Sequence, residues 1–299
     1  MATPTPRRDT GTPCTDTGTP RTDTRGIVDP AELLARVRFR RHTPAPELRP
    51  FLEHYWLIDW ALPEPYATQV VPHPSVNVVF QRYGRLGGPP EEAAASAEVS
   101  GIGLGLFTQR LSGTGRVCGI QFRPGGFRPF APAWPVSAWT SRRVPLGEVF
   151  PEVPEGAVAS VLSPDEDRER VAALDAFLLA LGPAPDPVAA QAMELVDLAR
   201  ADRAIRRASQ LAAASGLSAR SLQRLFASHV GVGPKWVILR YRIHEALERA
   251  ESAGTVEAAV DWPALAAELG YSDQAHLVRD FTATIGVPPT AYARGLSVP

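Results

Sequence analysis

The sequence is poor in cysteine, and this shortage excludes several classes of protein. Cys14 and Cys118 are the only cysteines in the chain of 299 residues. Two thiols exclude a disulfide framework and a cysteine-rich zinc site, and they are typical of a reducing compartment. We therefore expect a cytoplasmic protein in which Cys118, on a predicted strand, is buried and inert.

Long apolar runs and a strong charge of either sign are also missing. No stretch reaches the roughly 18 uncharged apolar residues of a membrane span, and the N-terminus has no apolar segment typical of a signal peptide. We therefore expect no membrane partner. The formal net charge is −1, and Lys235 is the only lysine, so a diffuse basic coat for nucleic acid is not expected. Any DNA binding must therefore depend on the positions of individual arginines and not on the overall charge of the chain.

Composition divides the chain into four predicted parts. Residues 1–26 are rich in Thr, Pro, Gly and Asp without periodicity, which predicts a disordered tail. Residues 27–155 carry short β-branched and aromatic runs between Pro and Gly, which predict an antiparallel barrel or sandwich. Residues 156–187 hold one helical pattern and a Pro-rich boundary. Residues 188–299 have helical patterns throughout, so the predicted fold class is α+β, with a mostly-β first domain and an all-α second domain.

The first domain should begin with a short helix at 29–36, with Asp29 as N-cap and Pro30 as first residue. Residues 85–98 are small or polar and are expected to form a loop. The helical pattern at 164–181 has an apolar stripe over 171–181, which would pack either on its own domain or on a second copy. The predicted strands are 55–60, 69–71, 76–80, 99–102 and 116–122.

The strongest pattern lies in the C-terminal third, around Ser218. Residues 210–216 predict a short helix that ends at Gly216, the residue type that most easily turns left-handed. Ser218 is a good N-cap for a second helix, whose core face carries Leu222 and Phe226. Its opposite face carries side chains that can read guanine and adenine edges in a major groove, namely Arg220, Gln223 and Arg224. Two short helices around a Gly turn indicate a helix-turn-helix unit.

The same pattern occurs a second time at one constant offset. Internal repetition predicts two helix-turn-helix units, at about 209–229 and at 261–284. Between them, a long helix is predicted from Pro234 to about Ala253. The matched pairs are Ser218 with Asp273, Leu222 with Leu277, Arg224 with Arg279, Phe226 with Phe281, and Gly231 with Gly286.

These residues resemble the DNA-binding domain of the AraC/XylS family of bacterial transcription regulators. The matching motifs are Leu222-Gln-Arg-Leu-Phe226 with Gly231-Val-Gly-Pro234, and Leu277-Val-Arg-Asp-Phe281 with Gly286-Val-Pro-Pro289. Gly233, where serine is commoner, and Asp280, an acid beside the base-reading face, depart from the family pattern. The resemblance implies a sequence-specific transcription regulator rather than an enzyme, with no cofactor. Its two recognition helices would enter successive major grooves about 34 Å apart, held by the long linker helix.

The resemblance also implies which residues contact DNA. An exposed helix face or an internal ion pair is the alternative for each basic residue, but the repeat position that Arg224 and Arg279 share favours DNA. Candidate phosphate contacts, which position the protein without reading sequence, are Lys235, Arg240, Arg242 and His276. The positions that match base contacts are Ala219, Arg220, Gln223 and Arg224 on the first recognition helix, and Gln274, Ala275, Val278 and Arg279 on the second.

Residues 73–80 and 122–130 resemble an uncharacterised sensor-type domain that is often fused to such regulators. This resemblance implies a cupin-like β-domain that binds a small-molecule effector or dimerises. The three histidines His42, His54 and His73 lack a His-x-His pair followed by Glu, so no metal is expected. The turn at 124–128 is expected to be structural rather than a ligand-pocket wall. Four tryptophans are expected in the core rather than in a ligand cage: Trp56, Trp60, Trp134 and Trp139.

Three functions remain to be compared. The first is a transcription regulator that binds double-stranded DNA and responds to an effector, with RNA polymerase and a second copy of the chain as further partners. The second is a regulator without a ligand, whose first domain is only a dimer or partner surface. The third is a DNA-repair methyltransferase that carries the same DNA-binding module, but two cysteines cannot supply its reactive thiol and four-cysteine zinc site.

Overall fold

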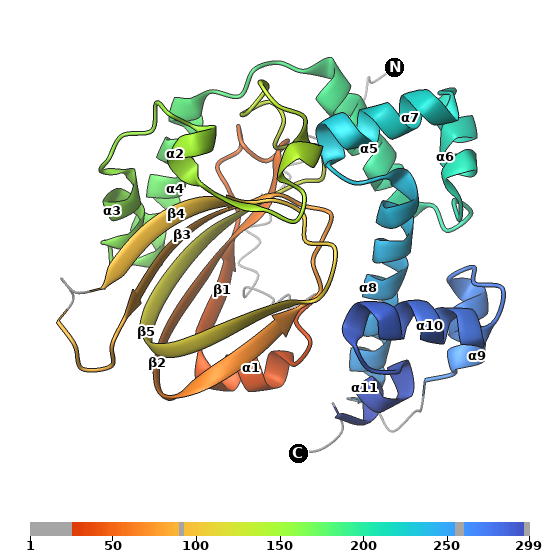
Figure 1. Cartoon of the computed structure of the whole chain (residues 1–299), viewed down its shortest axis with the longest axis horizontal. Helices are drawn as coiled ribbons and strands as arrows, with labels where there is room; N and C mark the ends of the chain where they lie inside the picture. The colour runs from red at the N-terminus through yellow and green to blue at the C-terminus, as the bar shows by residue number, and fades with distance from the viewer. Residues whose placement is uncertain (1–25, 90–92, 255–259, 296–299) are drawn as a thin grey trace, which may run out of the picture.

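The computed structural model describes residues 26–89, 93–254 and 260–295, so the predicted tail and Cys14 lie outside the described residues. A curved β-sheet lies beside a group of helices that are arranged along one long helix, α8 (Figure 1). The predicted α+β fold, with a β-rich first part and a helical second part, is confirmed. Within the described residues, no helix has both the length and the apolar composition that crossing a bilayer requires.

The sheet has six antiparallel strands in the order β1-β2-β5-β3-β4-β6. Two predicted strands, 55–60 and 69–71, belong to the single long strand β2, which has a register shift between Leu62 and Tyr66. The strands are β1 (Arg38–His42), β2 (Leu52–Val70), β3 (Asn77–Gly84), β4 (Ala94–Ser100), β5 (Phe107–Phe122) and β6 (Arg143–Pro145).

Two parts of the sheet differ from the prediction. The loop predicted at 85–98 is wrong from Ala94 on, because β4 begins there. It pairs with β3 in antiparallel fashion, from Ala94 opposite Tyr83 to Ser100 opposite Asn77. Small residues form this strand because backbone hydrogen bonds to β3 do not require β-branched side chains. The edge strand β1 was also missed, since the run Arg38–His42 has only one apolar residue.

One face of the sheet forms the main core with helices α3 (Ala157–Leu162) and α4 (Asp167–Leu181). Leu174 and Leu178 of α4 are fully buried in this cluster. Phe177 meets Phe80 of β3 edge to face, with ring centres 5.2 Å apart. The apolar stripe predicted over 171–181 therefore packs against its own domain. Cys118 is fully buried on the same face, as predicted, and burial raises the pKa of its thiol to about 11.

A group of charged side chains joins this face of the sheet to the start of α4. Asp59 accepts hydrogen bonds from Arg40 at 2.6 Å, from Arg116 at 2.7 Å and from Arg170 at 3.0 Å. Burial alone would raise the pKa of Asp59, but the hydrogen bonds from the three arginines lower it. The hydrogen bonds that Arg40 donates to Asp167 lower the pKa of that carboxyl to about 2. These contacts hold β1, β2, β5 and α4 together.

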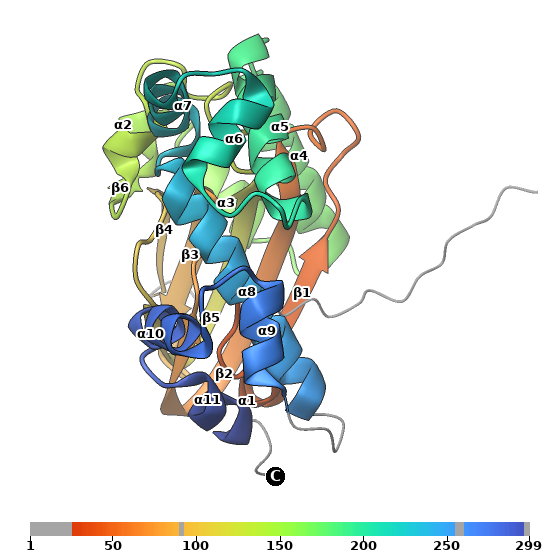
Figure 2. The same cartoon turned by 90° about the vertical axis from the view of Figure 1, so that its right-hand side faces the viewer.

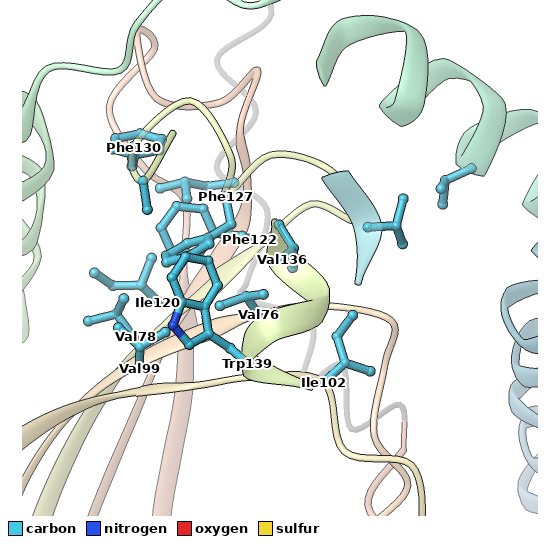
Figure 3. Close-up of a cluster of buried hydrophobic side chains, with 14 of the residues drawn as sticks. Val76, Val78, Val99, Ile102, Ile120, Phe122, Phe127, Phe130, Val136 and Trp139 are labelled. Carbon is cyan, nitrogen blue, oxygen red and sulfur yellow. The ribbon is translucent and has the colours of Figure 1, made fainter. Parts of the chain in front are cut away.

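Aromatic rings close one end of the core, where β5 leads into the turn at 124–126 (Figure 3). Phe127 packs edge to face on Phe122 and on Trp139, with ring centres 5.0 Å and 5.4 Å apart. A Cβ on Gly126 would lie 2.2 Å from the carbonyl oxygen of Phe51, so only glycine allows this close approach. The turn is therefore structural, as predicted.

Short helices complete the first part of the chain. They are α1 (Pro30–Arg36), the 3-10 turn η2 (Val136–Trp139) and α2 (Leu146–Val149). Asp29 caps α1 as predicted, because its carboxylate accepts the amide hydrogen of Glu32 at 2.9 Å.

All predicted helices of the second part are present. A π-helical turn, η3, continues α7 directly and ends at Gly231. The elements are α5 (Pro187–Ala201), α6 (Ala208–Ser215), α7 (Ala219–Leu225), η3 (Phe226–Val230), α8 (Pro234–Gly254), α9 (Trp262–Glu268), α10 (Gln274–Ile285) and α11 (Pro289–Gly295).

Candidate nucleic-acid interface and ligand cavity

The two repeated units start their second helices in the same way. The Ser218 hydroxyl accepts a first-turn amide hydrogen at 3.1 Å, and the Asp273 carboxylate does the same at 2.8 Å. Gly216 and Gly270 precede these caps with φ of +67° and +76°, a conformation that side chains rarely adopt. Each unit is therefore a helix, a left-handed glycine turn and a capped second helix, as the sequence predicted.

The repeated apolar positions form the cores of the two units. Leu222 and Phe226 on the first unit, and Leu277 and Phe281 on the second, are at most 1% exposed. Burying each such side chain contributes roughly 1.5–3 kcal/mol relative to leaving it in water. This burial fixes the rotation of α7 and α10 about their own axes, so the opposite face of each helix points to solvent.

The residues that the resemblance assigns to base contacts lie on those outer faces. Seven of the eight side chains are exposed, and Val278 is half-buried. Figure 2 shows α7 and α10 nearly end-on and on the same side of α8. Two helices presented in this way can meet one face of a duplex in successive major grooves. The exposed residues are Ala219, Arg220, Gln223 and Arg224 on α7, and Gln274, Ala275 and Arg279 on α10.

Arg240 does not fit its predicted role as a phosphate contact in this arrangement. Its side chain is 5% exposed, donates a hydrogen bond to the carbonyl oxygen of Leu104 at 2.8 Å, and lies over the Trp236 ring at 4.4 Å. Burial lowers its pKa to about 10. The sequence suggested a solvated face because it does not reveal that the sheet domain covers this side of α8.

The other three phosphate candidates differ in exposure. Lys235 and His276 are exposed at the starts of α8 and α10. Arg242 is half-buried with its guanidinium 5.6 Å from the centre of the Tyr271 ring, and burial lowers its pKa. Lys235 and His276 are therefore placed to reach a phosphate without rearrangement, whereas Arg242 is partly held inside the second unit.

The sheet domain contacts both helix-turn-helix units. At the first unit, the Thr140 hydroxyl donates to the carbonyl oxygen of Gly231 at 2.7 Å. At the second unit, the Tyr292 hydroxyl donates to the carbonyl oxygen of Val28 at 2.9 Å, and Val71 is fully buried in that unit's core. One domain therefore touches both units.

Two loops of the sheet domain also hold the linker helix α8 directly. The segment 71–76 stacks His73 on His244 with ring centres 4.0 Å apart, and the His244 ring also meets the carbonyl oxygen of Pro72 at 3.3 Å. The segment 101–106 supplies the Leu104 carbonyl to Arg240. Segment 71–76 connects β2 to β3, and segment 101–106 connects β4 to β5. Both segments therefore link strands of the sheet directly to α8.

The second face of the sheet lines a cavity of about 480 Å³. This volume falls within the range of small-molecule sites. Its walls are mostly apolar, and the loop residues Pro72, His73 and Leu104 form part of its rim. The turn at 124–128 is not among the lining residues. Strand residues that line the cavity include Phe39, Arg41, His54, Trp56, Ile58, Trp60, Asn77, Val79, Gln81, Tyr83, Val117 and Gln121.

The four tryptophans do not share one role. Trp139 is a core residue as predicted, whereas Trp134 is 63% exposed. Trp60 is 6% exposed in a second core cluster, as predicted, and the half-buried Trp56 packs against that cluster. Both indoles also line the cavity. Gly119 and Gly115 lie opposite them on β5, and a Cβ at either glycine would lie 1.9 Å from an indole ring. The indoles therefore lie against bare backbone, and the two strand glycines were the sequence signal for this arrangement.

The three histidines of the first domain are in separate places. His54 and His73 line the cavity, whereas His42 lies near Asp167 on the other side of the sheet. Across the described ranges, no three His, Cys, Asp or Glu side chains gather as a metal site would require.

Two family models match the chain. One, described as a domain of unknown function, DUF6597, matches residues 40–145, and the other, described as a helix-turn-helix domain, matches residues 211–295. The first match covers strands β1 to β6, and the second covers both repeated units from α6 to α11. The search of curated proteins returned no match.

Two solved structures are similar to the chain in part. ToxT from Vibrio cholerae is 11% identical, with a TM-score of 0.41 over 88% of this chain and 100% of its own. The C-terminal domain of AraT, a response regulator from Geobacillus stearothermophilus, is 19% identical, with a TM-score of 0.29 over 35% of this chain and 88% of its own. The chain is a DNA-binding transcription regulator with an AraC-type helix-turn-helix domain that follows a DUF6597 domain.

Proposed function

We propose that the chain is a sequence-specific regulator that places α7 and α10 in successive major grooves and responds to a small molecule in the cavity of its sheet domain. In this proposal, residues 27–155 are the effector domain, 156–187 the connection and 188–299 the DNA-binding domain. RNA polymerase and a second copy of the chain remain proposed partners, and the cytoplasm is the proposed compartment.

The observation that carries the DNA part is the paired exposure of Arg224 and Arg279 on helices that lie on one side of α8. Arginine can hold guanine O6 and N7 with two hydrogen bonds, and Gln223 and Gln274 suit adenine N6 and N7. Val278 offers only a methyl contact, so we propose that α10 discriminates bases less strongly than α7.

The effector part is supported by the way the cavity meets α8. Segments 71–76 and 101–106 contribute to the cavity rim and also hydrogen-bond or stack on His244 and Arg240. A ligand that moves either segment would therefore act on the helix that sets the separation of the two recognition helices. If the sheet domain is instead only a dimer or partner surface, no small molecule should change DNA affinity.

A footprint of the full chain on DNA tests the recognition geometry. Sites selected from a random library would be bound and cleaved with hydroxyl radicals. We expect two protected patches on one face of the duplex, separated by one helical turn, roughly 34 Å. A single protected patch, or patches on opposite faces, would contradict the docking of both helices.

Lys235 and Arg240 allow the phosphate contacts to be tested as a matched pair on α8. We expect Lys235→Met to weaken binding evenly across DNA sequences and to lower the salt slope by about 1, because one released counterion is lost. Arg240→Met should leave the salt slope unchanged, because its guanidinium is held by Leu104 and Trp236 and contacts no phosphate. Binding titrations at several salt concentrations measure the affinity and its dependence on salt. If Arg240→Met lowers the salt slope as much as Lys235→Met does, Arg240 reaches a phosphate, which requires α8 to separate from the sheet domain on DNA.

A further inference from the structure

The two helix-turn-helix units share one pattern but differ in charge. The windows that the repeat matches are residues 207–235 and 261–290. The first window holds four basic residues and no Asp or Glu, a formal charge of +4, and the second holds one basic residue and four acids, a formal charge of −3. The residues concerned are Arg207, Arg220, Arg224 and Lys235 in the first window, and Asp261, Glu268, Asp273, Arg279 and Asp280 in the second. A phosphate backbone should therefore attract the two units unequally.

The four cations of the first unit are free to meet phosphate. All four side chains are exposed, and none of them forms an ion pair within the residues that the structure describes. Arg220 and Arg224 lie on the outer face of α7, whose cap is the uncharged Ser218. An exposed cation without an internal partner keeps its full attraction for DNA phosphates. The first unit can therefore bind DNA of any sequence.

Three acids of the second unit have structural partners. Asp261 and Asp273 cap α9 and α10, since each carboxylate accepts a first-turn amide hydrogen, at 3.0 Å and 2.8 Å. Glu268 forms an ion pair with Arg249 of α8 at 3.4 Å. A cap does not require a charge, because the Ser218 hydroxyl caps the first recognition helix. The second recognition helix therefore begins with an exposed carboxylate that capping alone does not demand.

Asp280 is the acid that packing does not explain. It lies on α10 directly after Arg279, and its place in the repeat corresponds to Leu225, which is buried in the first unit. The carboxylate is half-buried and has no hydrogen bond or ion pair across the described ranges. Burial lowers the pKa of Arg242 on α8, and the negative charge of Asp280 opposes that shift, so the two groups lie near each other. A residue that breaks the pattern of a repeat in this way points to function.

Three arginines from outside the window adjoin the second unit but compensate its acids only in part. Arg249 is engaged by its ion pair, and Arg242 is half-buried near the Tyr271 ring. Arg206 is exposed and lies along the backbone of Gly270. On the recognition helices themselves, α7 with its cap has two cations and no acid, whereas α10 with its cap has one cation and two acids. Phosphates therefore attract the first recognition helix and oppose the approach of the second.

We infer that the first unit holds the chain on DNA, and that the second unit docks only where its base contacts offset the repulsion of Asp273 and Asp280 by phosphates. This inference rests on the proposed docking of α7 and α10. On DNA without a matching sequence, the first unit alone neutralises phosphates and the second stays outside its groove. Matching bases for Gln274 and Arg279 bring the second unit in. Its docking is thus the step that a small change in free energy shifts most easily.

Titrations of the full chain with three duplexes test this division between the units. The duplexes carry the selected site intact, with its second half-site scrambled, or with its first half-site scrambled. Measurements cover a salt series at about pH 8, where histidine side chains are neutral. Scrambling the first half-site should weaken binding about tenfold more than scrambling the second. A loss from the second half-site as large as that from the first overturns the inference.

The salt dependence is the sharper measurement, because base contacts contribute little to it. The salt slopes for the intact site and for the duplex with a scrambled second half-site should agree within about 0.5, because docking of the second unit releases few counterions. A slope for the intact site that is steeper by more than this margin also overturns the inference, because the second unit would then neutralise phosphates of its own.

Neutral variants of the two acids test the repulsion directly. Asp280→Asn and Asp273→Asn keep the size of the side chain, and asparagine preserves the cap at 273. Each should strengthen binding to the intact site about two- to fivefold, because a charge roughly 10 Å from a few phosphates acts on them through water. Neither should change binding to the duplex with a scrambled second half-site.

Glu194→Gln is the matched control for these variants, since Glu194 is an exposed acid on α5, outside both units. We expect it to leave binding to every duplex unchanged. The inference fails if neither aspartate variant strengthens binding to the intact site, or if Glu194→Gln strengthens it as much as they do.

Failure of the proposed docking would look different. If the intact site and a fully scrambled duplex bind equally, or if hydroxyl radicals reveal a single protected patch, the proposed function fails. If two patches appear but both half-sites contribute equally and the intact site has the steeper salt slope, the docking stands and the division between the units is wrong.

Discussion

Asp59→Asn is expected to destabilise the sheet domain by about 3–5 kcal/mol, the usual effect of removing one partner from a buried ionic group. The substitution keeps the shape of the side chain but removes the charge that faces Arg40, Arg116 and Arg170. Arg170 is 1% exposed, so its guanidinium cannot turn to water without opening the packing between α4 and the sheet. Urea unfolding followed by near-ultraviolet circular dichroism measures the loss.

The control for this prediction is Asp165→Asn. Asp165 also pairs with Arg116, at 3.2 Å, but its side chain is 94% exposed, so we expect a change of about 0.5 kcal/mol or less. A loss below about 1 kcal/mol for Asp59→Asn would contradict the prediction, because exposed ion pairs already account for that much.

Acid provides a second check on the same carboxyl. The pKa of Asp59 is lowered in the folded state, so its contribution to stability is complete above the unfolded value of about 3.9 and is lost as the pH falls through the folded value. The difference between the wild type and Asp59→Asn should therefore be constant near pH 7 and shrink below about pH 4. A difference that grows on acidification would have the wrong sign.

The helical half of the fold could be predicted closely because its signals are local. Caps at Ser218 and Asp273, left-handed glycines at 216 and 270, and apolar positions three and four residues apart each act within one or two turns of helix. The outer faces of α7 and α10 followed from the same periodicity, since burying one side of a helix exposes the other.

The sheet and the ligand cavity depended on contacts between distant segments. The Arg-rich strand β1 and the small residues of β4 have weak strand preferences, and they form strands because β2 and β3 present partners for their backbone groups. Nothing in the local sequence of Trp56 and Trp60 separates them from Trp139, and only their pairing with Gly119 and Gly115 shows that their rings also line a cavity.

The role of Arg240 was misjudged for a related reason. On α8 alone its position is exposed, and the 101–106 segment that covers it lies far away in the sequence. Whether a basic side chain on a linker helix faces DNA or another domain is therefore decided by how the domains pack, which helical periodicity does not report. The arginines of α7 and α10 avoid this ambiguity, because they stay exposed with the described sheet domain in place.

Arg224→Ala and Arg279→Ala are each expected to weaken binding to a selected DNA site by about 1–3 kcal/mol, or roughly 5- to 150-fold. Non-specific affinity and the salt slope should stay nearly unchanged, because a bidentate base contact contributes only at its own base pair. Arg168→Ala is the control, since this arginine is also exposed but lies on α4 of the sheet domain. Titrations against the selected site and a scrambled duplex provide the comparison.

The two losses should add in the double variant if α7 and α10 dock in different grooves as proposed, because residues without a shared partner contribute independently. Each single variant should also relax discrimination at its own base pair, and the two affected base pairs should lie about one helical turn apart. Equal losses on the selected and scrambled duplexes would instead make these arginines phosphate contacts. That outcome would leave Arg220, Gln223 and Gln274 as the side chains that read sequence. The position that Arg224 and Arg279 share in the repeat would then no longer indicate base reading.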